Sequence, residues 1–567
     1  MRYTALACDY DGTIASHGLV DEGTIAALQR LRNSGRRLIL VTGRELNDLL
    51  NVFPDSDLFD RIVAENGALV YDSADRTEQL LGEPPPPELF LSLRERGVAP
   101  LSAGRVILAT WTPHETTVLE TIRDLGLELS VIFNKGAVMV VPSGLNKATG
   151  LVVALDALSL SPHNVVGIGD AENDHAFLQL CEFGVATANA LPTLKQHADF
   201  VTAGDHGAGV TELIDEIIAS DLKRIDAAIS RHDVVIGITA EGEDVRSKPA
   251  DQRVLIAGPS GSGKSTLATR LLELLTERAY QICILDPEGD YADFASAVHV
   301  GDATHEPSLH EVLELLAEPS QSVAVNLLAV RLDERPGFLA ALLPHLQELR
   351  TRTGRPHWIV VDEAHHLLPA DSHHAPSVLP ADLRGLLLIT VHPDQIASRA
   401  IHDLDVVLAT GTKPHETLRG TPNVDLGTLP RMPEPGESIR WSRTTGRAVP
   451  FLPEAPRAER LRHRRKYAEG QLGPDKSFFF TGPDGALNLR AHNLILFVQL
   501  ADGVDERTWL YHLRRGDYSR WFEEAIKDPE LAAEAAQVER NEGIDAEESR
   551  RSIRAAIEER YTLPAAE

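Results

Sequence analysis

Short runs of apolar, often β-branched residues recur along the first three quarters of the chain. Examples are TALACDYD, RLILVTGR, GAVMVVP, NVVGIGD, QICILDP and HWIVVDE, and most of them carry an acidic residue, a threonine or a glycine within their last three residues. Stretches with helical periodicity, such as LHEVLELLAE, separate the runs. Strands that alternate with helices predict parallel α/β sheets, and ligands bind such sheets at the carboxyl ends of the strands. We therefore predict an α/β protein with its sites where these runs end.

The length of 567 residues exceeds what one hydrophobic core supports, since domains usually have about 100–200 residues. We predict a Rossmann-like first domain over residues 1–222, with an inserted cap at about 80–140 that opens on a proline cluster. A second α/β domain is predicted over 223–450, where ITAEGEDV resembles a short hairpin. Residues 451–567 are aromatic-rich and predict a small α+β segment with surface helices at its end.

The first candidate site begins with Asp9-Tyr-Asp11-Gly-Thr, directly after the apolar run ALAC. Two carboxylates two residues apart on a turning chain can share one site. One of them can attack phosphorus while the other handles the proton of the leaving group. Asp9 and Asp11 are therefore the candidates for the nucleophile and for the acid and base.

Three further pieces fit a phosphate site. Thr42 ends a second run with a hydroxyl and nearby backbone donors, and Lys147 supplies a positive charge for phosphoryl oxygens. Asp170 and Asp174 follow a third run, and their oxygens suit Mg²⁺. Each piece alone is usually a solvated turn, a helix cap or a surface charge. Together, and in this order, they predict a metal-dependent phosphohydrolase.

This set resembles the four motifs of the haloacid dehalogenase superfamily, and the resemblance covers about residues 1–222. DYDGT matches the first motif, Thr42 the second, Lys147 the third and GDAEND the fourth. The insertion lies between the second and third motifs, where the Cof-like subclass IIB carries an α/β cap. The resemblance implies a phosphatase of small phosphorylated metabolites, because a cap normally selects the substrate.

The resemblance also implies roles for the site residues. Asp9 would form a phospho-aspartyl intermediate, and Asp11 would protonate the leaving alcohol and later activate water. Mg²⁺ would lie between Asp9, the backbone carbonyl of Asp11 and Asp170. Asp174 would support the metal or Lys147. Asn173 would shape the same loop.

A second phosphate site is predicted where the run RVLIA meets the helical stretch TLATRLLELL. The sequence between them fits G-x-x-x-x-G-K-[ST], the pattern whose backbone N–H groups cradle nucleotide phosphates. Lys264 would reach the β- and γ-phosphates of ATP, and Ser265 would bind Mg²⁺. The residues expected to bind the nucleotide are Gly258, Gly261, Gly263, Lys264, Ser265 and Thr266.

HWIVVDEAHHLL supplies the partner motif about 100 residues downstream. We expect Asp362 to hold Mg²⁺ through water and Glu363 to polarise the attacking water. His365 and His366 are adjacent on a helix and are expected to face different ways, as structural or secondary contacts.

Two more stretches, ILDPEGDY and LLLITVHPDQI, extend the likeness of residues 230–415 to HerA-like ATPases of the FtsK/VirB4 group. His392 stands where Gln is common, and the long N-terminal barrel of that group is reduced to a hairpin at most. These departures leave ATP binding as the property that the resemblance implies. Arg352, Arg355 and Arg399 are equal candidates for an arginine finger.

The C-terminal segment holds a locally basic run, RLRHRRKYAEG, which is more often a solvated helix face than a nucleic-acid site. SFFFTGPDGALNLRAHNL predicts a strand, a turn and a second strand. DERTWLYHLRRGDYSRWF predicts an amphipathic helix and a turn. Its Trp and Tyr residues are expected in a core or at a docking surface.

The net charge of −29 argues against broad nucleic-acid binding. Only three cysteines are present, and no apolar run reaches the roughly 18 residues that span a bilayer. We expect a cytoplasmic protein that forms no contact with membranes and is a candidate homo-oligomer. Its function is expected to be a phosphatase fused to an ATP-hydrolysing domain. The alternatives are a nucleic-acid end-processing kinase and phosphatase, and an ATP-dependent assembly module that displays a phosphatase.

Overall fold

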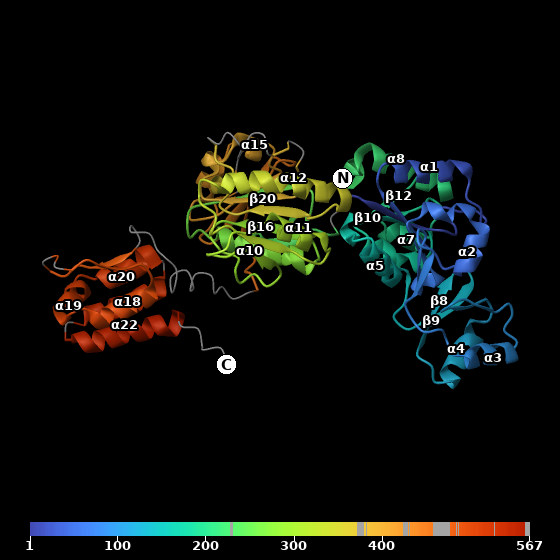
Figure 1. Ribbon diagram of the computed structural model, residues 1–567, viewed down its shortest axis with the longest axis horizontal. Coiled ribbons are helices and arrows are strands. Elements are labelled where there is room, and N and C mark those ends of the chain that lie inside the picture. The colour runs from blue at the N-terminus through green and yellow to red at the C-terminus, as the bar shows by residue number, and fades with distance from the viewer. Residues whose placement is uncertain are drawn as a thin grey trace.

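The computed structural model describes residues 1–226, 231–370, 379–380, 383–422, 424, 429, 431–457, 477–483, 485, 487–526, 528–541 and 543–561. These residues form two large sheets, a smaller cap sheet and a C-terminal hairpin with helices. In Figure 1 they group into a part that runs from blue to green, a part that runs from green to orange, and a red C-terminal part. The structure is therefore mixed α/β, as the sequence predicts.

The first sheet has eight strands in the order β12-β11-β10-β1-β2-β3-β4-β5. The six strands from β12 to β3 are parallel, and β4 and β5 add an antiparallel edge. The strands are β1 (Ala5–Asp9), β2 (Arg37–Val41), β3 (Arg61–Ala64), β4 (Leu69–Asp72), β5 (Thr77–Leu80), β10 (Val165–Gly169), β11 (Phe183–Ala186) and β12 (Phe200–Val201).

Helices cover both faces of this sheet. On one face the core includes residues of α1 and α8, and on the other it includes residues of α5, α6 and α7. Side-chain caps fix where two of them begin: Asp21 accepts from the backbone N–H of Thr24, and Asn146 caps α5. The helices are α1 (Glu22–Asn33), α2 (Leu46–Val52), α5 (Lys147–Ala157), α6 (His175–Leu180), α7 (Pro192–His197), α8 (His206–Ser220) and α9 (Lys223–Asp226).

The cap is an antiparallel sheet in the order β6-β7-β9-β8, with two helices packed on one face. Its elements are α3 (Pro87–Glu95), β6 (Ser102–Ala103), β7 (Leu108–Trp111), α4 (Glu115–Asp124), β8 (Leu129–Asn134) and β9 (Ala137–Pro142). The run GAVMVVP, which we expected in the parallel sheet, forms β9 of this cap. Its apolar residues are buried between the cap helices and the first domain, so composition alone did not separate the two sheets.

The second large sheet has eleven strands in the order β14-β13-β23-β22-β21-β15-β20-β19-β16-β18-β17. The strands from β21 to β17 are parallel, and the other four are antiparallel. The strands are β13 (Val234–Ile238), β14 (Asp244–Ser247), β15 (Arg253–Ala257), β16 (Ile282–Asp286), β17 (Val298–Val300), β18 (Val323–Asn326), β19 (Trp358–Val361), β20 (Leu386–Thr390), β21 (Val406–Ala409), β22 (Ser438–Ser442) and β23 (Arg447–Pro453). The hairpin in ITAEGEDV is confirmed as β13 and β14, and β23 runs past residue 450 to pair with β13.

The helices of this domain also lie on both faces of its sheet, with α10 on one side and α11 and α12 on the other. They are α10 (Lys264–Glu277), α11 (Leu309–Ala317), α12 (Arg335–Thr353), α13 (Ala364–Leu367), α15 (Ser398–Ile401) and α16 (Pro414–Arg419). Gly354 ends α12 in the left-handed conformation that glycine adopts most readily.

The C-terminal part consists of β24 (Phe478–Phe480), β25 (Leu489–Ala491), α18 (Leu494–Gly503), α19 (Glu506–Arg514), α20 (Asp517–Trp521), α21 (Pro529–Arg540) and α22 (Ala546–Tyr561). The predicted strand–turn–strand is confirmed, because β24 and β25 pair antiparallel. Trp509, Tyr518 and Trp521 lie in its own buried core. The last two helices supply core residues as well, so they are more than surface helices. The basic run at 460–470 lies outside the described residues.

The first two domains meet through the amino ends of their strands. Glu182, which precedes β11, accepts from Tyr280 Oη at 2.8 Å, and Tyr280 precedes β16. Asn164 precedes β10 and its Oδ1 lies 3.1 Å from Nε2 of His357, which precedes β19. The carboxyl ends of both sheets, where the predicted sites lie, therefore point away from this interface.

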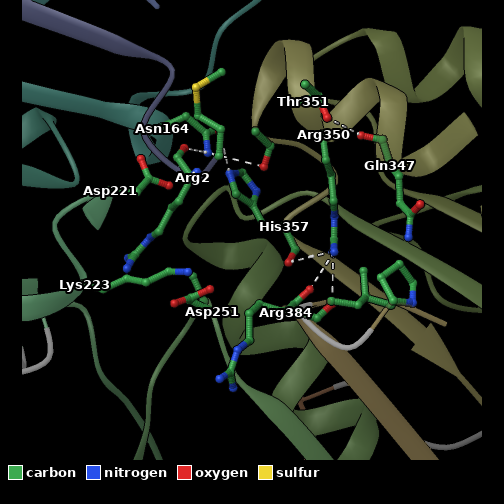
Figure 2. Close-up of a pocket in the computed structure, with 16 residues that line it drawn as sticks. Arg2, Asn164, Asp221, Lys223, Asp251, Gln347, Arg350, Thr351, His357 and Arg384 are labelled. Atoms are coloured by element: carbon green, nitrogen blue, oxygen red, sulfur yellow. Dashed lines mark hydrogen bonds between the residues drawn. The ribbon is translucent and has the colours of Figure 1, made fainter. Parts of the chain in front are cut away.

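A cavity of about 430 Å³ lies at the same interface. Figure 2 shows Arg2, Asn164 and Asp221 of the first domain on one side of it, with His357 and Arg350 of the second domain on the other. The Arg350 guanidinium donates to backbone carbonyls of the residues just before β19 and just before β20, so it serves the fold of its own domain.

Candidate functional site

The predicted nucleophile lies at the carboxyl end of β1, in contact with a buried lysine. Lys147 Nζ, at the first turn of α5, is 2.5 Å from Asp9 Oδ1 and 2.5 Å from Asp174 Oδ1. All three side chains are buried, with Lys147 fully excluded from solvent. The Lys147 ammonium can therefore offset the charge of the two carboxylates, and it lies next to the position of any phosphoryl group that Asp9 attacks.

Asp170 and Asp174 lie in the loop after β10, at the same site. The second oxygen of Asp174 accepts from the backbone N–H groups of Asp170 and Ala171, so this carboxylate fixes the loop after β10. Thr13 donates to Asp9 Oδ2 at 3.0 Å. Asn173, expected to shape this loop, donates from its amide to Asn66 Oδ1.

The second motif brings an arginine that the sequence did not single out. Thr42 follows β2, and its hydroxyl accepts from the backbone N–H of Arg44. The Arg44 guanidinium then donates to both oxygens of Asp11, at 2.7 and 2.8 Å. Asp11, the predicted acid and base, is thus paired with a cation, and its carboxylate is partly exposed.

A lysine of the cap reaches the same site. Lys135 Nζ lies 2.5 Å from Asp170 Oδ2 and 3.2 Å from the backbone carbonyl oxygen of Asp11. Asn189 donates to Asp170 Oδ2 as well, at 3.2 Å. Neither Lys135 nor Asn189 belongs to a motif, so only the folded cap and the loop after β11 show them at the site.

Burial and crowding of like charges shift the pKa values of this cluster. Burial, followed by the charge of Asp174, raises the pKa of Asp9 to about 7, and the ammonium of Lys147 opposes this rise. Burial also raises the pKa of Asp170, against the hydrogen bond from Lys135. For Lys147 burial works toward a lower pKa, but the charges of Asp174 and Asp9 outweigh it and raise the pKa.

The carboxylates of Asp9, Asp170 and Asp174 offer oxygens that all lie within 4.8 Å of one another. Such hard oxygen donors are the ligands that Mg²⁺ prefers, so the residues fit this metal. Both oxygens of Asp174 are already engaged with Lys147 and the backbone. Asp9, Asp170 and the carbonyl of Asp11 are the other donors. Lys135 contacts the last two of them, so an ion held there would take the place of the Lys135 ammonium.

The second site lies between β15 and α10, as the sequence predicts. Gly261 and Gly263 both have positive φ, at 73° and 88°, which lets the loop curl before the helix begins at Lys264. Lys264 Nζ donates to the carbonyl of Pro259 at 2.9 Å, within the same loop. Ser265 and Thr266 follow it in the first turn of α10, and Gly258 begins the loop.

Asp362 and Glu363 follow β19, which is separated from β15 by β20. Glu363 has φ 40°, a strained backbone for a non-glycine residue, as is common at functional sites. The His365 and His366 rings lie 4.1 Å apart, so the expectation that they face different ways is wrong; the short helix α13 turns both toward one side.

His365 also contacts the end of the next strand. Its Nδ1 lies 3.1 Å from the hydroxyl of Thr390, and its ring is 5.3 Å from that of His392. Burial, followed by the charges of His366 and His392, lowers the pKa of His365 to about 4, so this ring is neutral near pH 7. Arg355 is buried at the domain interface, where it donates to the Ser159 carbonyl, and this removes it from the arginine-finger candidates.

Comparison with known proteins matches two regions of the chain. The haloacid dehalogenase-like hydrolase family matches residues 6–83 and 111–214, and an AAA domain family matches residues 249–407. A phosphoglycolate phosphatase of Methanothermobacter thermautotrophicus is 30% identical over 219 residues, which make up 37% of this chain and 96% of that protein. The chain belongs to the haloacid dehalogenase-like hydrolases.

Other relatives of this hydrolase cover the same region. Phosphoglycolate phosphatase 2 of Saccharolobus solfataricus is 28% identical over 239 residues, covering 39% of this chain and 95% of that protein. A crystal structure of a haloacid dehalogenase-like hydrolase from Bacteroides thetaiotaomicron has 20% identity and a TM-score of 0.35, and it covers 38% of this chain and 99% of its own. The chain thus joins a haloacid dehalogenase-like hydrolase region to an AAA domain with a P-loop.

Among the residues that the structure describes, no helix of the hydrolase is long and apolar enough to cross a membrane.

Proposed function

We propose that the first domain is a Mg²⁺-dependent phosphatase that forms a phospho-aspartyl intermediate on Asp9. The observation that carries this proposal is the buried cluster in which Lys147 bridges Asp9 and Asp174 at the carboxyl ends of β1 and β10. The proposed substrate is a small phosphate ester such as 2-phosphoglycolate. The names of the relatives support this choice, and the cap that covers the site favours a small molecule.

In the proposed reaction, Asp9 Oδ attacks phosphorus and the bond to the leaving alcohol breaks. Asp11 protonates that alcohol, and then takes the proton of the water that attacks the phospho-aspartate. Lys147 offsets the negative charge of the phosphoryl oxygens, and the Thr42 hydroxyl supplies a donor to them. Bound Mg²⁺, held by Asp9, Asp170 and the Asp11 carbonyl, would supply further positive charge.

Arg44 fixes the position of the Asp11 carboxylate before substrate binds. Its guanidinium holds both carboxylate oxygens of Asp11, so this side chain must change partners to reach a leaving group. Asp48 also binds Arg44, at 2.7 Å, and can keep the guanidinium in place when Asp11 turns. The pair is therefore the part of the site that we expect to rearrange when substrate binds.

The test is phosphate release from 2-phosphoglycolate with and without Mg²⁺, measured with malachite green. Asp9→Asn removes the nucleophile with little change in size, and we expect it to abolish release. Asp55→Asn changes an exposed aspartate outside the site and is the matched control. Turnover that survives in Asp9→Asn would refute the role of Asp9.

For the second domain we propose ATP binding and hydrolysis, with a HerA-like architecture. Support comes from the loop of Gly258 to Thr266 between β15 and α10, and from Asp362 and Glu363 after β19. Asp362 would hold Mg²⁺ through water and Glu363 would orient the attacking water. Phosphate release from ATP that persists in Glu363→Gln would refute this role of Glu363.

The geometry of the interface favours this function over end processing of nucleic acids. Because both sheets meet at their amino ends, the two sites open in opposite directions and one bound end has no short path between them. Transfer of labelled γ-phosphate from ATP to an oligonucleotide, instead of to water, would restore the end-processing alternative. ATP-dependent change in mass without phosphate release would favour the assembly module.

A further inference from the structure

One histidine of the second domain lies between the carboxylate proposed to orient water and the neighbouring strand. His365 Nδ1 is 3.1 Å from the hydroxyl of Thr390, the last residue of β20, and 3.4 Å from Oε2 of Glu363. The His365 side chain is only 10% exposed, so protein groups surround it instead of solvent. One ring nitrogen therefore faces both a hydroxyl and a carboxylate.

The backbone after β19 brings the histidine to this place. Glu363 has φ 40° and ψ 52°, a left-handed conformation that costs stability in a residue other than glycine. The short helix α13 begins directly after Glu363, and His365 is its second residue. Because β20 is the neighbour of β19 in the sheet, a side chain of α13 can reach the end of β20. The strained turn thus sets both Glu363 and His365 beside Thr390.

Thr390 connects this pair to the nucleotide loop. It is fully buried, and it pairs with Ala257, which ends β15 directly before Gly258 of the loop. Its hydroxyl accepts from the backbone N–H of His392 at 2.9 Å, which fixes the position of the hydroxyl oxygen. In the sheet β20 lies between β19 and β15. The contact of the histidine with Thr390 is therefore made at the centre of the predicted ATP site.

The neighbours of the ring indicate which nitrogen carries its proton. His365 is neutral near pH 7, so only one of its two ring nitrogens donates. An Nδ1 without a proton would point a lone pair toward the carboxylate of Glu363, whereas a protonated Nδ1 donates to that carboxylate. The carboxylate thus favours the tautomer with the proton on Nδ1. That proton lies within reach of Glu363 Oε2 and Thr390 Oγ1 together.

We propose that His365 is a positioning residue for ATP hydrolysis, which holds the carboxylate of Glu363 toward the water that this carboxylate orients. The inference rests on the proposed ATPase function and adds a residue to its site. Because His365 acts through Glu363, its loss slows the chemical step. ATP binding stays unchanged, since the phosphates are bound by the loop before α10.

The test compares two substitutions of His365 in the full-length protein, with ATP and Mg²⁺. His365→Leu removes the nitrogen and keeps a side chain of similar bulk, whereas His365→Asn returns an amide N–H close to the place of Nδ1. We expect kcat of His365→Leu to fall about tenfold or more, the effect of losing one hydrogen bond to a charged group, while KM for ATP changes by less than about twofold. His365→Asn should recover most of the lost kcat.

A second measurement asks whether His365 acts through Glu363. In the Glu363→Gln background the carboxylate is already gone, so His365→Leu should cause little further loss of phosphate release in single turnovers of labelled ATP. The matched control is His366→Leu, on the same short helix. Among the described residues the His366 ring forms no hydrogen bond with Glu363 or Thr390, so this variant should keep kcat close to that of the wild-type protein.

Three results would overturn the inference. They are an unchanged kcat in His365→Leu, an equal loss of kcat in His366→Leu, and a full further loss from His365→Leu in the Glu363→Gln background. A lower Tm of His365→Leu together with weaker ATP binding would make His365 a structural residue instead. Absence of ATP hydrolysis in the wild-type protein would refute the proposed ATPase function, and the inference with it.

Discussion

Removing one hydroxyl at the interface between the first two domains tests whether the two domains unfold as one cooperative unit. Tyr280 Oη donates to Glu182 Oε2 at 2.8 Å, and its ring stacks on His163 at a centroid distance of 3.8 Å. Glu182 also binds Arg2 at 2.6 Å and His163 at 2.8 Å. Tyr280→Phe keeps the stacking and deletes only the hydrogen bond.

The size of the effect follows from the state of Glu182. Burial alone would raise its pKa, but the hydrogen bond from His163 and the charge of Arg2 hold that pKa well below its ordinary value, so the carboxylate is ionised. A hydrogen bond to a charged group contributes about 1.5–3 kcal/mol. Because Glu182 keeps its hydrogen bonds to Arg2 and His163, we expect a loss at the lower end of this range. Tyr280→Phe should lower the free energy of unfolding by about 1.5 kcal/mol.

The assay is native-state hydrogen exchange of the full-length protein, with peptides from β10 and β16 followed separately. If the domains open together, Tyr280→Phe lowers the protection of both strands by the same free energy. The matched control is Tyr511→Phe, which deletes a hydroxyl that Arg515 contacts on the C-terminal helix α19 and should change neither peptide. If Tyr280→Phe lowers the protection of β16 alone, or of neither strand, the two domains do not unfold as one cooperative unit.

Three further predictions concern single buried or loop residues. Lys147→Met leaves two buried carboxylates without their cation and should lower the unfolding free energy by about 3–5 kcal/mol in urea melts, with part of the loss restored by Asp174→Asn. Burial holds the pKa of His357 well below its ordinary value, so below about pH 6.5 only the unfolded chain takes up this proton. The stability that His357 provides is therefore intact above that pH and falls by up to about 1.4 kcal/mol per pH unit below it, and His357→Asn should flatten this slope in urea melts. Lys264→Met should remove the roughly 2.7 kcal/mol by which ATP at 100 times its Kd protects the second domain in thermal melts.

One experimental result would contradict each of these three predictions. Unchanged stability of Lys147→Met would mean that the buried charges are compensated by other groups. Identical pH slopes for the wild-type protein and His357→Asn would assign the acid sensitivity elsewhere. Full protection of Lys264→Met by ATP would show that this lysine does not bind the phosphates.

The sequence was most informative where a side chain and its strand are neighbours in the chain. Asp9, Thr42 and Asp170 each follow an apolar run, and parallel pairing of those runs brings them to one edge of the sheet. The same logic placed Lys264 and Asp362 in the second domain. These residues lie where local sequence and sheet topology together determine position.

Residues that reach a site across the fold were not visible in the sequence. Lys135 lies in the turn before a cap strand, β9, that resembles those of the main sheet in composition. Arg44 matters only because its guanidinium folds back on Asp11. The interface through Glu182 and Tyr280 joins residues 98 positions apart that belong to no motif. Long-range side-chain contacts of this kind depend on the packing of whole domains, which periodicity does not encode.

The most direct test of the phosphatase account is to trap the phosphoryl group on the protein. Asp11→Asn removes the group proposed to activate water, and p-nitrophenyl phosphate has a leaving group that needs no acid, so the intermediate should accumulate after mixing with this ester and Mg²⁺ and quenching in acid. Peptide mass spectrometry should then find one phosphoryl group on Asp9, released by hydroxylamine and absent from Asp9→Asn. A phosphoryl group on another residue, or none while Asp9→Asn still turns over, would contradict the account.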